Sequence, residues 1–329
     1  MKTNFKKIVL VAVLLVVLAS VIAVALFVAD RLDNHGEEIP SDGSDFENTM
    51  NAVYIDGEKY YPRLGVRNYL IMGIDKFEGQ DKRGQSDFIM ILSIDLYSEK
   101  YTIVSVNRDT MVEVDHYDTN EKKGETKVEQ IALSHAYGKK DVESNKQKCK
   151  NTELSVSRLF GGMKFDGYIS MTMDAVEVIV DSIGGVEVLV TDDLTAYDPR
   201  LVKDTYVMLD GELALKFVRA RGGLEDSTNI ARMARQEEFL RAFFEKLGVE
   251  SSVSEALDFY EEVTPKLVSN MDEIEQLNLV TKIAEFERQD SITPEGAGII
   301  NPETKLREFY VSDASIKEIL KDIFYDKAN

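Results

Sequence analysis

The sequence has few of the residues on which cross-linked or zinc-binding proteins depend. Its 329 residues include one cysteine, three histidines and six prolines. The single Cys149 excludes an intramolecular disulfide framework and a cysteine-rich metal site. The histidines, His35, His116 and His135, are scattered along the chain, which argues against a zinc site. Because 44% of the residues are hydrophobic and 30% are charged, the composition indicates a globular protein rather than a disordered one.

Positive charge is also scarce. The chain has 39 lysines and arginines against 59 acidic residues, which gives a formal net charge of −20 at pH 7. Proteins that bind nucleic acids capture the phosphate backbone with a surplus of lysine and arginine. The charge balance therefore argues against DNA or RNA binding and against a direct role in transcription.

One long stretch, residues 8–29, contains no charged residue at all. About 20 apolar residues cross a bilayer, so this stretch predicts a transmembrane helix. Lys2, Lys6 and Lys7 precede it, and the positive-inside rule then places the N-terminus in the cytoplasm and the rest of the chain outside. The alternative is a cleaved secretory signal, whose apolar region is usually about 7–15 residues long. The length favours a retained anchor, and both interpretations export the body of the protein.

The segments around this anchor give the expected domain organisation. Residues 1–7 form a cytoplasmic tail, residues 8–29 the anchor, and residues 30–50 an acidic, turn-rich extracellular tether. Residues 51–329 form the extracellular domain. We therefore expect a single-pass protein of the cell membrane.

Apolar runs at residues 68–74, 88–96 and 101–106 predict strands, the last two joined as a hairpin. Continuous apolar runs suit strands that helices cover on both faces. The alternation of such runs with amphipathic segments predicts one α/β domain with α–β–α layers. The other expected elements are a hairpin at 53–61, helices at 127–137, 151–160, 172–183, 210–220 and 230–247, and strands at 186–190 and 308–311.

Charged residues lie at the ends of the three predicted strands. Asp75 ends the first, Asp87 opens the second, and Arg108-Asp109 follows the third. Ligands of open α/β sheets bind at such edges. The alternative is that strand ends adjoin polar loops, where some carboxylates are expected in any case.

Four arginines form a second group: Arg219, Arg221, Arg232 and Arg235. The spacing of three places Arg232 and Arg235 on one helical face. Arginine forks bind phosphate or carboxylate in bidentate fashion. The alternative is that nearby acidic residues simply neutralise them.

Carboxylates together with arginines suggest phosphoryl chemistry, in which a hard cation and guanidinium groups share the charge of a pyrophosphate. The sequence contains no Walker A loop, no glycine-rich dinucleotide fingerprint, no serine nucleophile elbow and no HExxH motif. A phosphate site would therefore be built from side chains.

Seven segments resemble, in order, successive motifs of the LytR-CpsA-Psr family. The motifs are specific as a set, and they follow a single N-terminal anchor. The segments are residues 68–75 (NYLIMGID), 86–87 (SD), 105–110 (SVNRDT), 181–188 (DSIGGVEV), 209–215 (LDGELAL), 217–221 (FVRAR) and 229–236 (NIARMARQ).

The resemblance implies a fold and an activity. Members of this family are membrane-anchored phosphotransferases with an α–β–α sandwich around a central mixed β-sheet and an apolar pocket for a lipid chain. They move an anionic glycopolymer, such as teichoic acid or capsule, from a polyprenyl (pyro)phosphate carrier to peptidoglycan, with Mg²⁺ or Mn²⁺ as the cofactor. A pyrophosphatase side activity is compatible with this chemistry. A different class remains open: a non-catalytic binder of lipid-linked polymer that acts as a scaffold for wall assembly.

Carried over residue by residue, the resemblance assigns roles to the charged positions. Asp75 and Asp87 would hold the metal, and Asp109 would orient Arg108. One carboxylate would take the proton of the acceptor hydroxyl. The catalytic set is then Asp75, Asp87, Arg108 and Asp109, and the pyrophosphate ligands are Arg108, Arg219, Arg221, Arg232 and Arg235.

Three positions depart from the family pattern. Asn107 stands where proline usually precedes the motif arginine, and we expect this change to loosen the loop that presents Arg108. Gln85 replaces an arginine before Ser86-Asp87. Asn229 replaces an aspartate before the last arginine pair, which removes a carboxylate from the site.

Overall fold

A computed structural model describes residues 52–75, 84–118, 120, 122–139, 145–220, 229–250 and 263–328. Residues 51–329 form one compact unit. The predicted cytoplasmic tail, anchor and tether, residues 1–50, lie outside the described residues. Within the described ranges, no helix is long and apolar enough to cross a membrane.

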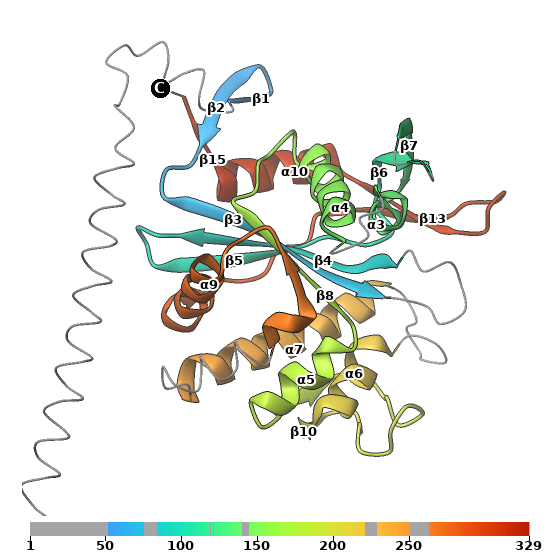
Figure 1. Cartoon of the computed structure of the whole chain (residues 1–329), viewed down its shortest axis with the longest axis vertical. Coiled ribbons are helices and arrows are strands. Elements are labelled where there is room, and N and C mark those ends of the chain that lie inside the picture. Colours follow the sequence, from blue (N-terminus) through green and yellow to red (C-terminus); the bar gives the residue numbers. More distant parts are fainter. Residues whose placement is uncertain are drawn as a thin grey trace, which may run out of the picture. The chain divides into compact units, whose positions relative to one another are not determined.

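A mixed six-stranded sheet forms the centre of this unit (Figure 1). Its middle strands β3 (Val66–Asp75), β4 (Gln85–Asp95) and β5 (Lys100–Ser105) pair antiparallel, while β8 (Gly167–Thr172) lies parallel to β3. These middle strands confirm the three predicted apolar strands and the mixed sheet. The sheet order is β11-β8-β3-β4-β5-β12, with β11 (Leu267–Ser269) and β12 (Glu287–Arg288) at its edges.

Helices cover both faces of the sheet (Figure 1). Successive residues of β3 point to opposite faces, so Leu70 packs in one core with Val156 of α4, and Ile71 packs in another core with Leu279 of α9. This arrangement confirms the α–β–α layers and explains why the strands read as continuous apolar runs. The covering helices are α4 (Lys146–Leu159) and α10 (Asp313–Ile319) on one face, and α7 (Asn229–Glu250) and α9 (Glu273–Glu285) on the other.

A third apolar cluster joins α7 to two short helices and a hairpin. Helix α6 (Gly211–Arg219) begins where the Asp210 carboxylate accepts a hydrogen bond from the Leu213 amide at 2.8 Å. A Cβ at Gly211 would lie 2.3 Å from the backbone oxygen of Glu177, so only glycine permits this approach to α5. The packing sets the direction of α6, whose last residue is Arg219. The other members are α5 (Ala175–Ser182), β9 (Val186–Val190) and β10 (Thr205–Leu209).

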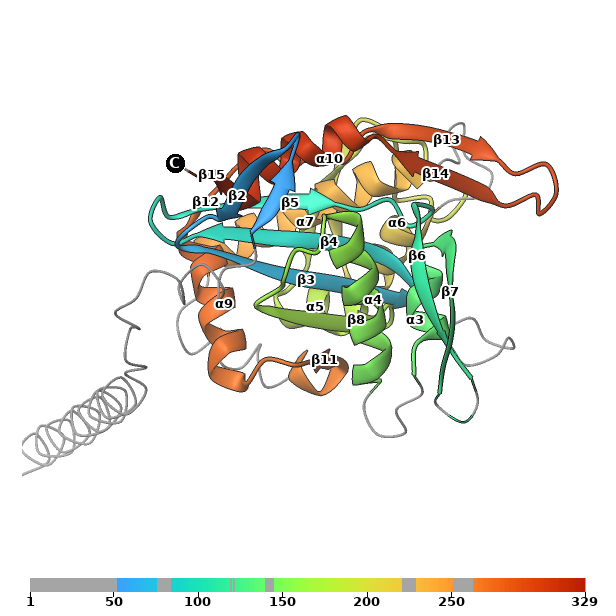
Figure 2. The ribbon, with the colours of Figure 1, turned by 90° about the horizontal axis from the view of Figure 1, so that it is seen from above.

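Smaller elements surround these layers. Two hairpins, β6–β7 and β13–β14, project at one end of the sheet (Figure 2). The bounds of the remaining elements are β1 (Val53–Ile55), β2 (Glu58–Pro62), β6 (Met111–Tyr117), β7 (Lys123–Gln130), α3 (Leu133–Tyr137), η1 (Thr264–Lys266), β13 (Gly296–Ile300), β14 (Arg307–Val311), the π-helix η2 (Leu320–Phe324) and β15 (Tyr325–Lys327).

Two predicted helices were wrong in part. The segment 127–137 is not one helix, because its first residues belong to β7, where Lys127 pairs with Val114 of β6, and only α3 is helical. Thr172 ends β8, and the next helix starts at Ala175. The predicted elements do not include the strands β6, β8, β10, β11, β12, β13 and β15 or the helices α9 and α10. The predicted hairpin at 53–61 is confirmed by the pairing of β1 with β2.

Cys149 offers a test of the packing of α4. Its side chain is fully buried, and burial raises the pKa of Cys149 to about 11. We expect the native protein to resist alkylation by iodoacetamide at pH 8, because the thiol is both protonated and enclosed. The same chain in guanidinium chloride should gain a single adduct by mass spectrometry. Rapid labelling of the native protein would contradict the packing.

Candidate active site

The ends of three central strands meet at one edge of the sheet, as predicted. β3 ends at Asp75, which lies opposite Gln85 at the start of β4. Asp87 is the third residue of β4, and Arg108-Asp109 follows the end of β5. Asp75, Asp87, Arg108 and Asp109 are all at most 9% exposed. The structure thus brings the charged strand-end residues into a buried setting.

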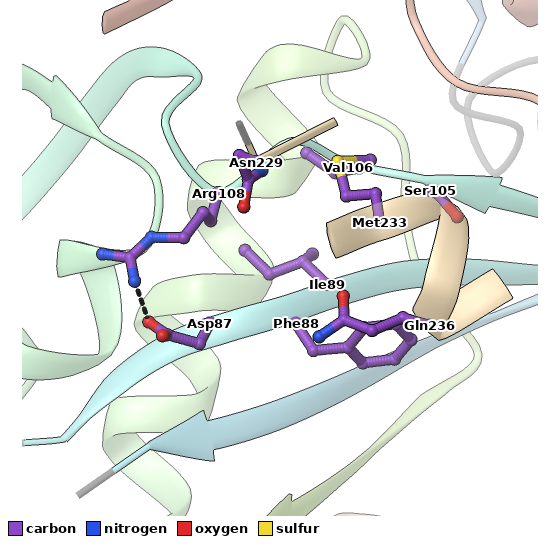
Figure 3. Close-up of a pocket in the computed structure, with 9 residues that line it drawn as sticks. All are labelled: Asp87, Phe88, Ile89, Ser105, Val106, Arg108, Asn229, Met233 and Gln236. Atoms are coloured by element: carbon purple, nitrogen blue, oxygen red, sulfur yellow. Dashed lines mark hydrogen bonds and ion pairs between the residues drawn. The ribbon is translucent and has the colours of Figure 1, made fainter. Parts of the chain in front are cut away.

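Arg108 bridges the loop after β5 and the start of β4. Its guanidinium group forms a short ion pair with the Asp87 carboxylate (Figure 3). A second nitrogen, Nη2, donates to Gln85 Oε1 at 2.6 Å. Gln85, which departs from the family pattern, therefore serves as an acceptor for the arginine side chain.

Two further arginines reach the same carboxylates from the helices. Arg232 of α7 is buried, and its Nη1 lies 3.5 Å from Asp87 Oδ2. Arg219, at the end of α6, pairs with Asp75, and its side chain is 43% exposed. The structure therefore gathers three of the predicted arginines around two of the predicted aspartates.

Opposing effects act on the ionisation of Asp87. Burial raises the pKa of Asp87, because water no longer stabilises the charged form. Arg108 and Arg232 lower it, and the negative charge of Asp75 raises it. Burial dominates, so the pKa of Asp87 lies above the usual aspartate value.

Asp109 faces a different set of groups. Its Oδ1 accepts a hydrogen bond from Gln130 Nε2 at 3.0 Å and lies 3.5 Å from Arg108 Nε. Gln130 also donates to the Arg307 backbone oxygen at 2.7 Å, which ties this loop to β14. Gln130 was not identified from the sequence, because it falls in the segment predicted to be a helix.

Arg235 is not brought to this group. It is 1% exposed, and its Nη1 bonds the Asp192 carboxylate at 2.5 Å while Nη2 bonds the Ala220 backbone oxygen. Through these contacts Arg235 holds α7 against the segments around Asp192 and Ala220. Arg221 lies outside the described residues.

Two positions that depart from the family pattern contact each other. Asn229 Nδ2 donates to Asn107 Oδ1 at 2.7 Å, and the same oxygen accepts from the Asp109 amide at 3.0 Å. Arg232 Nη2 donates to Asn229 Oδ1 at 2.6 Å. A chain of buried hydrogen bonds therefore links Arg232 to the Arg108 loop. We expected Asn107 to loosen this loop, but the contact ties it to α7.

A small pocket adjoins the Asp87–Arg108 pair. The pocket in Figure 3 has a volume of about 10 Å³ and is lined by the Asp87–Arg108 pair together with Phe88, Met233 and Gln236, among others. Such a volume holds about one water molecule. This pocket by itself is therefore too small for a phosphate group, whereas the Arg219 side chain is 43% exposed to solvent.

The two carboxylates are suitable donors for a hard cation. Asp75 is near enough to raise the pKa of Asp87. Mg²⁺ commonly uses one or two carboxylates together with phosphate oxygens of a substrate. Among the described residues, no group of three or more acidic, histidine or cysteine side chains could hold a metal. The site would supply at most two carboxylates to a cation, and substrate phosphate oxygens would have to supply further ligands.

The amide chain can be tested with two matched substitutions. In Asn229→Asp, the donor to Asn107 Oδ1 is lost and two oxygens face each other. We expect the free energy of unfolding to fall by about 1–3 kcal/mol in urea titrations. In Asn107→Asp, the acceptor is retained, so this hydrogen bond should survive. Equal stability of Asn229→Asp and the wild type would contradict the assigned bond.

The chain is similar in sequence to proteins of a known family. The model of the LytR_cpsA_psr family matches residues 44–321. The polyisoprenyl-teichoic acid–peptidoglycan teichoic acid transferase TagU of Bacillus mycoides (strain KBAB4) is 26% identical over 211 residues, which are 64% of this chain and 62% of that protein. The chain therefore spans less than two thirds of that relative's length.

Solved structures share the fold. The crystal structure of B. subtilis TagV has a TM-score of 0.62 at 20% identity and covers 79% of this chain and 96% of that one. The structure of TagT bound to LIIa-WTA has a TM-score of 0.60 at 21% identity and covers 79% and 89%. The family match includes the central sheet and every described site residue. The resemblance is confirmed, and the chain belongs to the LytR_cpsA_psr family.

Proposed function

We propose that this protein transfers an anionic glycopolymer, such as a teichoic acid or a capsular polymer, from a polyprenyl (pyro)phosphate carrier to peptidoglycan. The name of the relative TagU supports this proposal, because it describes a teichoic acid transfer to peptidoglycan. The observation that carries it is the Asp87 carboxylate held between Arg108 and Arg232 at the sheet edge.

The arginines would recognise the diphosphate of the donor. Guanidinium forks bind phosphate in bidentate fashion, and the structure presents those of Arg108, Arg219 and Arg232 at one edge. In the free protein their partners are carboxylates. Phosphate oxygens would replace these partners when the donor binds, so the positive charge needed for the transition state is already in place.

The transfer is a phosphoryl substitution. The acceptor hydroxyl oxygen attacks the phosphorus next to the sugar, the bond from this phosphorus to the bridging oxygen breaks, and polyprenyl phosphate leaves. One carboxylate of the Asp75–Asp87 pair takes the hydroxyl proton. Mg²⁺ or Mn²⁺ held by the same pair would supply positive charge to the phosphoryl oxygens. Water in place of the acceptor would give a pyrophosphatase side reaction.

The location follows from the sequence. Residues 8–29 would anchor the protein in the cell membrane with the N-terminus in the cytoplasm, and the domain 51–329 would work outside. This topology would put the site on the side of the membrane where peptidoglycan lies.

A second function belongs to a different class: a non-catalytic binder of lipid-linked polymer that acts as a scaffold for wall assembly. The Asn107–Asn229 pair favours it, because a neutral amide replaces a carboxylate beside the arginines. The two functions differ in turnover, since the binder would retain polyprenyl pyrophosphate without cleaving it.

The transfer proposal is tested with Arg108→Ala and Asp87→Asn in the full chain. Removal of a charge that stabilises the transition state typically lowers kcat by about 10²–10³-fold. We expect this loss in the transfer of polymer from a polyprenyl-pyrophosphate donor to peptidoglycan, followed through released polyprenyl phosphate. Circular dichroism checks that both variants fold.

Arg241→Ala is the matched control. Arg241 also lies on α7, but it pairs with Glu238 and Glu245 at the surface, so its loss should leave transfer near the wild-type rate. Normal transfer by both site variants would refute the site, and donor binding without turnover by the wild type would establish the scaffold function.

The metal proposal makes a separate prediction. Chelation with EDTA should stop transfer, and added Mg²⁺ should restore it. Asp75→Asn should shift the Mg²⁺ concentration for half-maximal activity upwards by about tenfold or more, because one anionic ligand is lost. Unchanged Mg²⁺ dependence of this variant would exclude Asp75 as a ligand.

A further inference from the structure

A groove outside the candidate active site lies between α4 and the segment 163–165. Its volume is about 380 Å³, and none of the candidate active-site residues that the structure describes lines it. Helix α4 separates the two regions, because the Thr152 hydroxyl contacts Ser86 next to Asp87, whereas Lys150, Glu153 and Leu154 line the groove. The groove is therefore an additional space of the size of a small ligand.

Within the part of the chain that the structure describes, the charged side chains of this groove form no close ion pair, although Lys150 and Glu153 interact electrostatically. Among the described residues, the side chains of Lys150, Glu153 and Lys164 form no hydrogen bond and no ion pair within 4 Å. Arg158 on the same helix behaves differently, because its Nη2 pairs with Asp115 at 3.0 Å. Lysine ammonium groups without a close ion pair beside a cavity can contact an anionic ligand.

Asn151 gives an independent sign of a missing partner. It lines the groove and is 4% exposed, and its Nδ2 donates to the backbone oxygens of Asp115 and Ser134 at 2.9 and 2.6 Å. These bonds fix the amide, yet the buried Oδ1 accepts no hydrogen bond. Buried acceptors are nearly always satisfied in native proteins, by protein groups or by ordered water, so a small donor such as water would complete the bonding of this enclosed oxygen at the wall of the groove.

The remaining lining indicates the chemistry of the ligand. Two ammonium groups outnumber the single carboxylate, although the chain as a whole carries −20. Burial raises the pKa of Glu153, and the charge of Lys150 opposes this effect. Tyr117 and Phe165 add aromatic surface. Aromatic surface suits the apolar faces of sugar rings, polar side chains suit their hydroxyls, and ammonium groups suit phosphate or carboxylate.

We propose that this groove binds a segment of an anionic saccharide chain. The inference rests on the proposed function, which supplies two sources of such a chain: the polymer that is transferred and the glycan that accepts it. Both offer anionic groups for Lys150 and Lys164 and sugar-ring faces for Tyr117 and Phe165. The groove would hold the chain at a distance from the reacting phosphate and add affinity for it.

The experiment measures binding to the full chain in detergent by calorimetry. One probe is a short sugar-substituted polyol-phosphate oligomer, and the other is a soluble peptidoglycan oligosaccharide. Lys150→Gln and Lys164→Gln should each weaken binding of the preferred probe by about fivefold, because each removes one partly exposed ionic contact. Leu154→Trp should fill the groove and weaken binding further. Lys266→Gln, an exposed lysine outside the groove, is the matched control and should bind like the wild type.

The outcomes separate this inference from the proposed function. The probe that binds identifies the source of the chain. Failure of both probes to bind, or equal binding by all groove variants, would overturn the inference while transfer activity stays intact. Binding that depends on the groove in a chain that never transfers polymer would refute the proposed function and uphold the groove.

Discussion

The burial of the Asp87 carboxylate is the constraint on which the site depends. A charge enclosed by protein must be paired, and the pairing here comes from the loop after β5 and from α7 at once. Arg108 and Arg232 can satisfy this requirement only if both segments lie against the start of β4. The buried charge therefore fixes the positions of elements that are far apart in the chain. It also holds two guanidinium groups close together, where they could bind a phosphate.

Hydrogen bonds between neutral amide side chains support the position of the Arg108 loop. The Asn107–Asn229 bond joins the loop to the first turn of α7, and Asn229 also accepts from Arg232. A carboxylate at position 229 could accept from Arg232, but it could not donate to Asn107. The two departures from the family pattern are thus complementary: the second amide is useful because the first supplies its acceptor. Gln85 acts in the same sense, because its side-chain oxygen accepts from Arg108.

Elements and residues could be predicted from the sequence where strand burial, or a position next to the end of an apolar run, determines the structure. The strands β3 to β5 were predicted because helices cover both of their faces, and Asp75, Asp87 and Arg108 were found because strand ends are visible as the ends of apolar runs. β7 was missed because its first residues are exposed and no alternation marks them, so only its pairing with β6 reveals the strand. Side-chain partners were beyond local patterns: Asn107 and Asn229 lie 122 residues apart. Arg235 shares a helical face with Arg232, but it forms an ion pair with Asp192. The spacing of residues along a helix does not reveal a partner from another segment.

The two ion pairs at the sheet edge differ in their access to water. The Arg219 side chain is 43% exposed, whereas that of Arg108 is 10% exposed. Screening and competition by dissolved ions act strongly on exposed charges and weakly on buried ones. An incoming anion would therefore exchange places with Asp75 at Arg219 before it disturbs the inner group around Asp87. Because Arg219 is more hydrated than Arg108, an anion would replace the carboxylate partner of Arg219 first and the partner of Arg108 afterwards. Arg219 would then be the first arginine that the anion contacts.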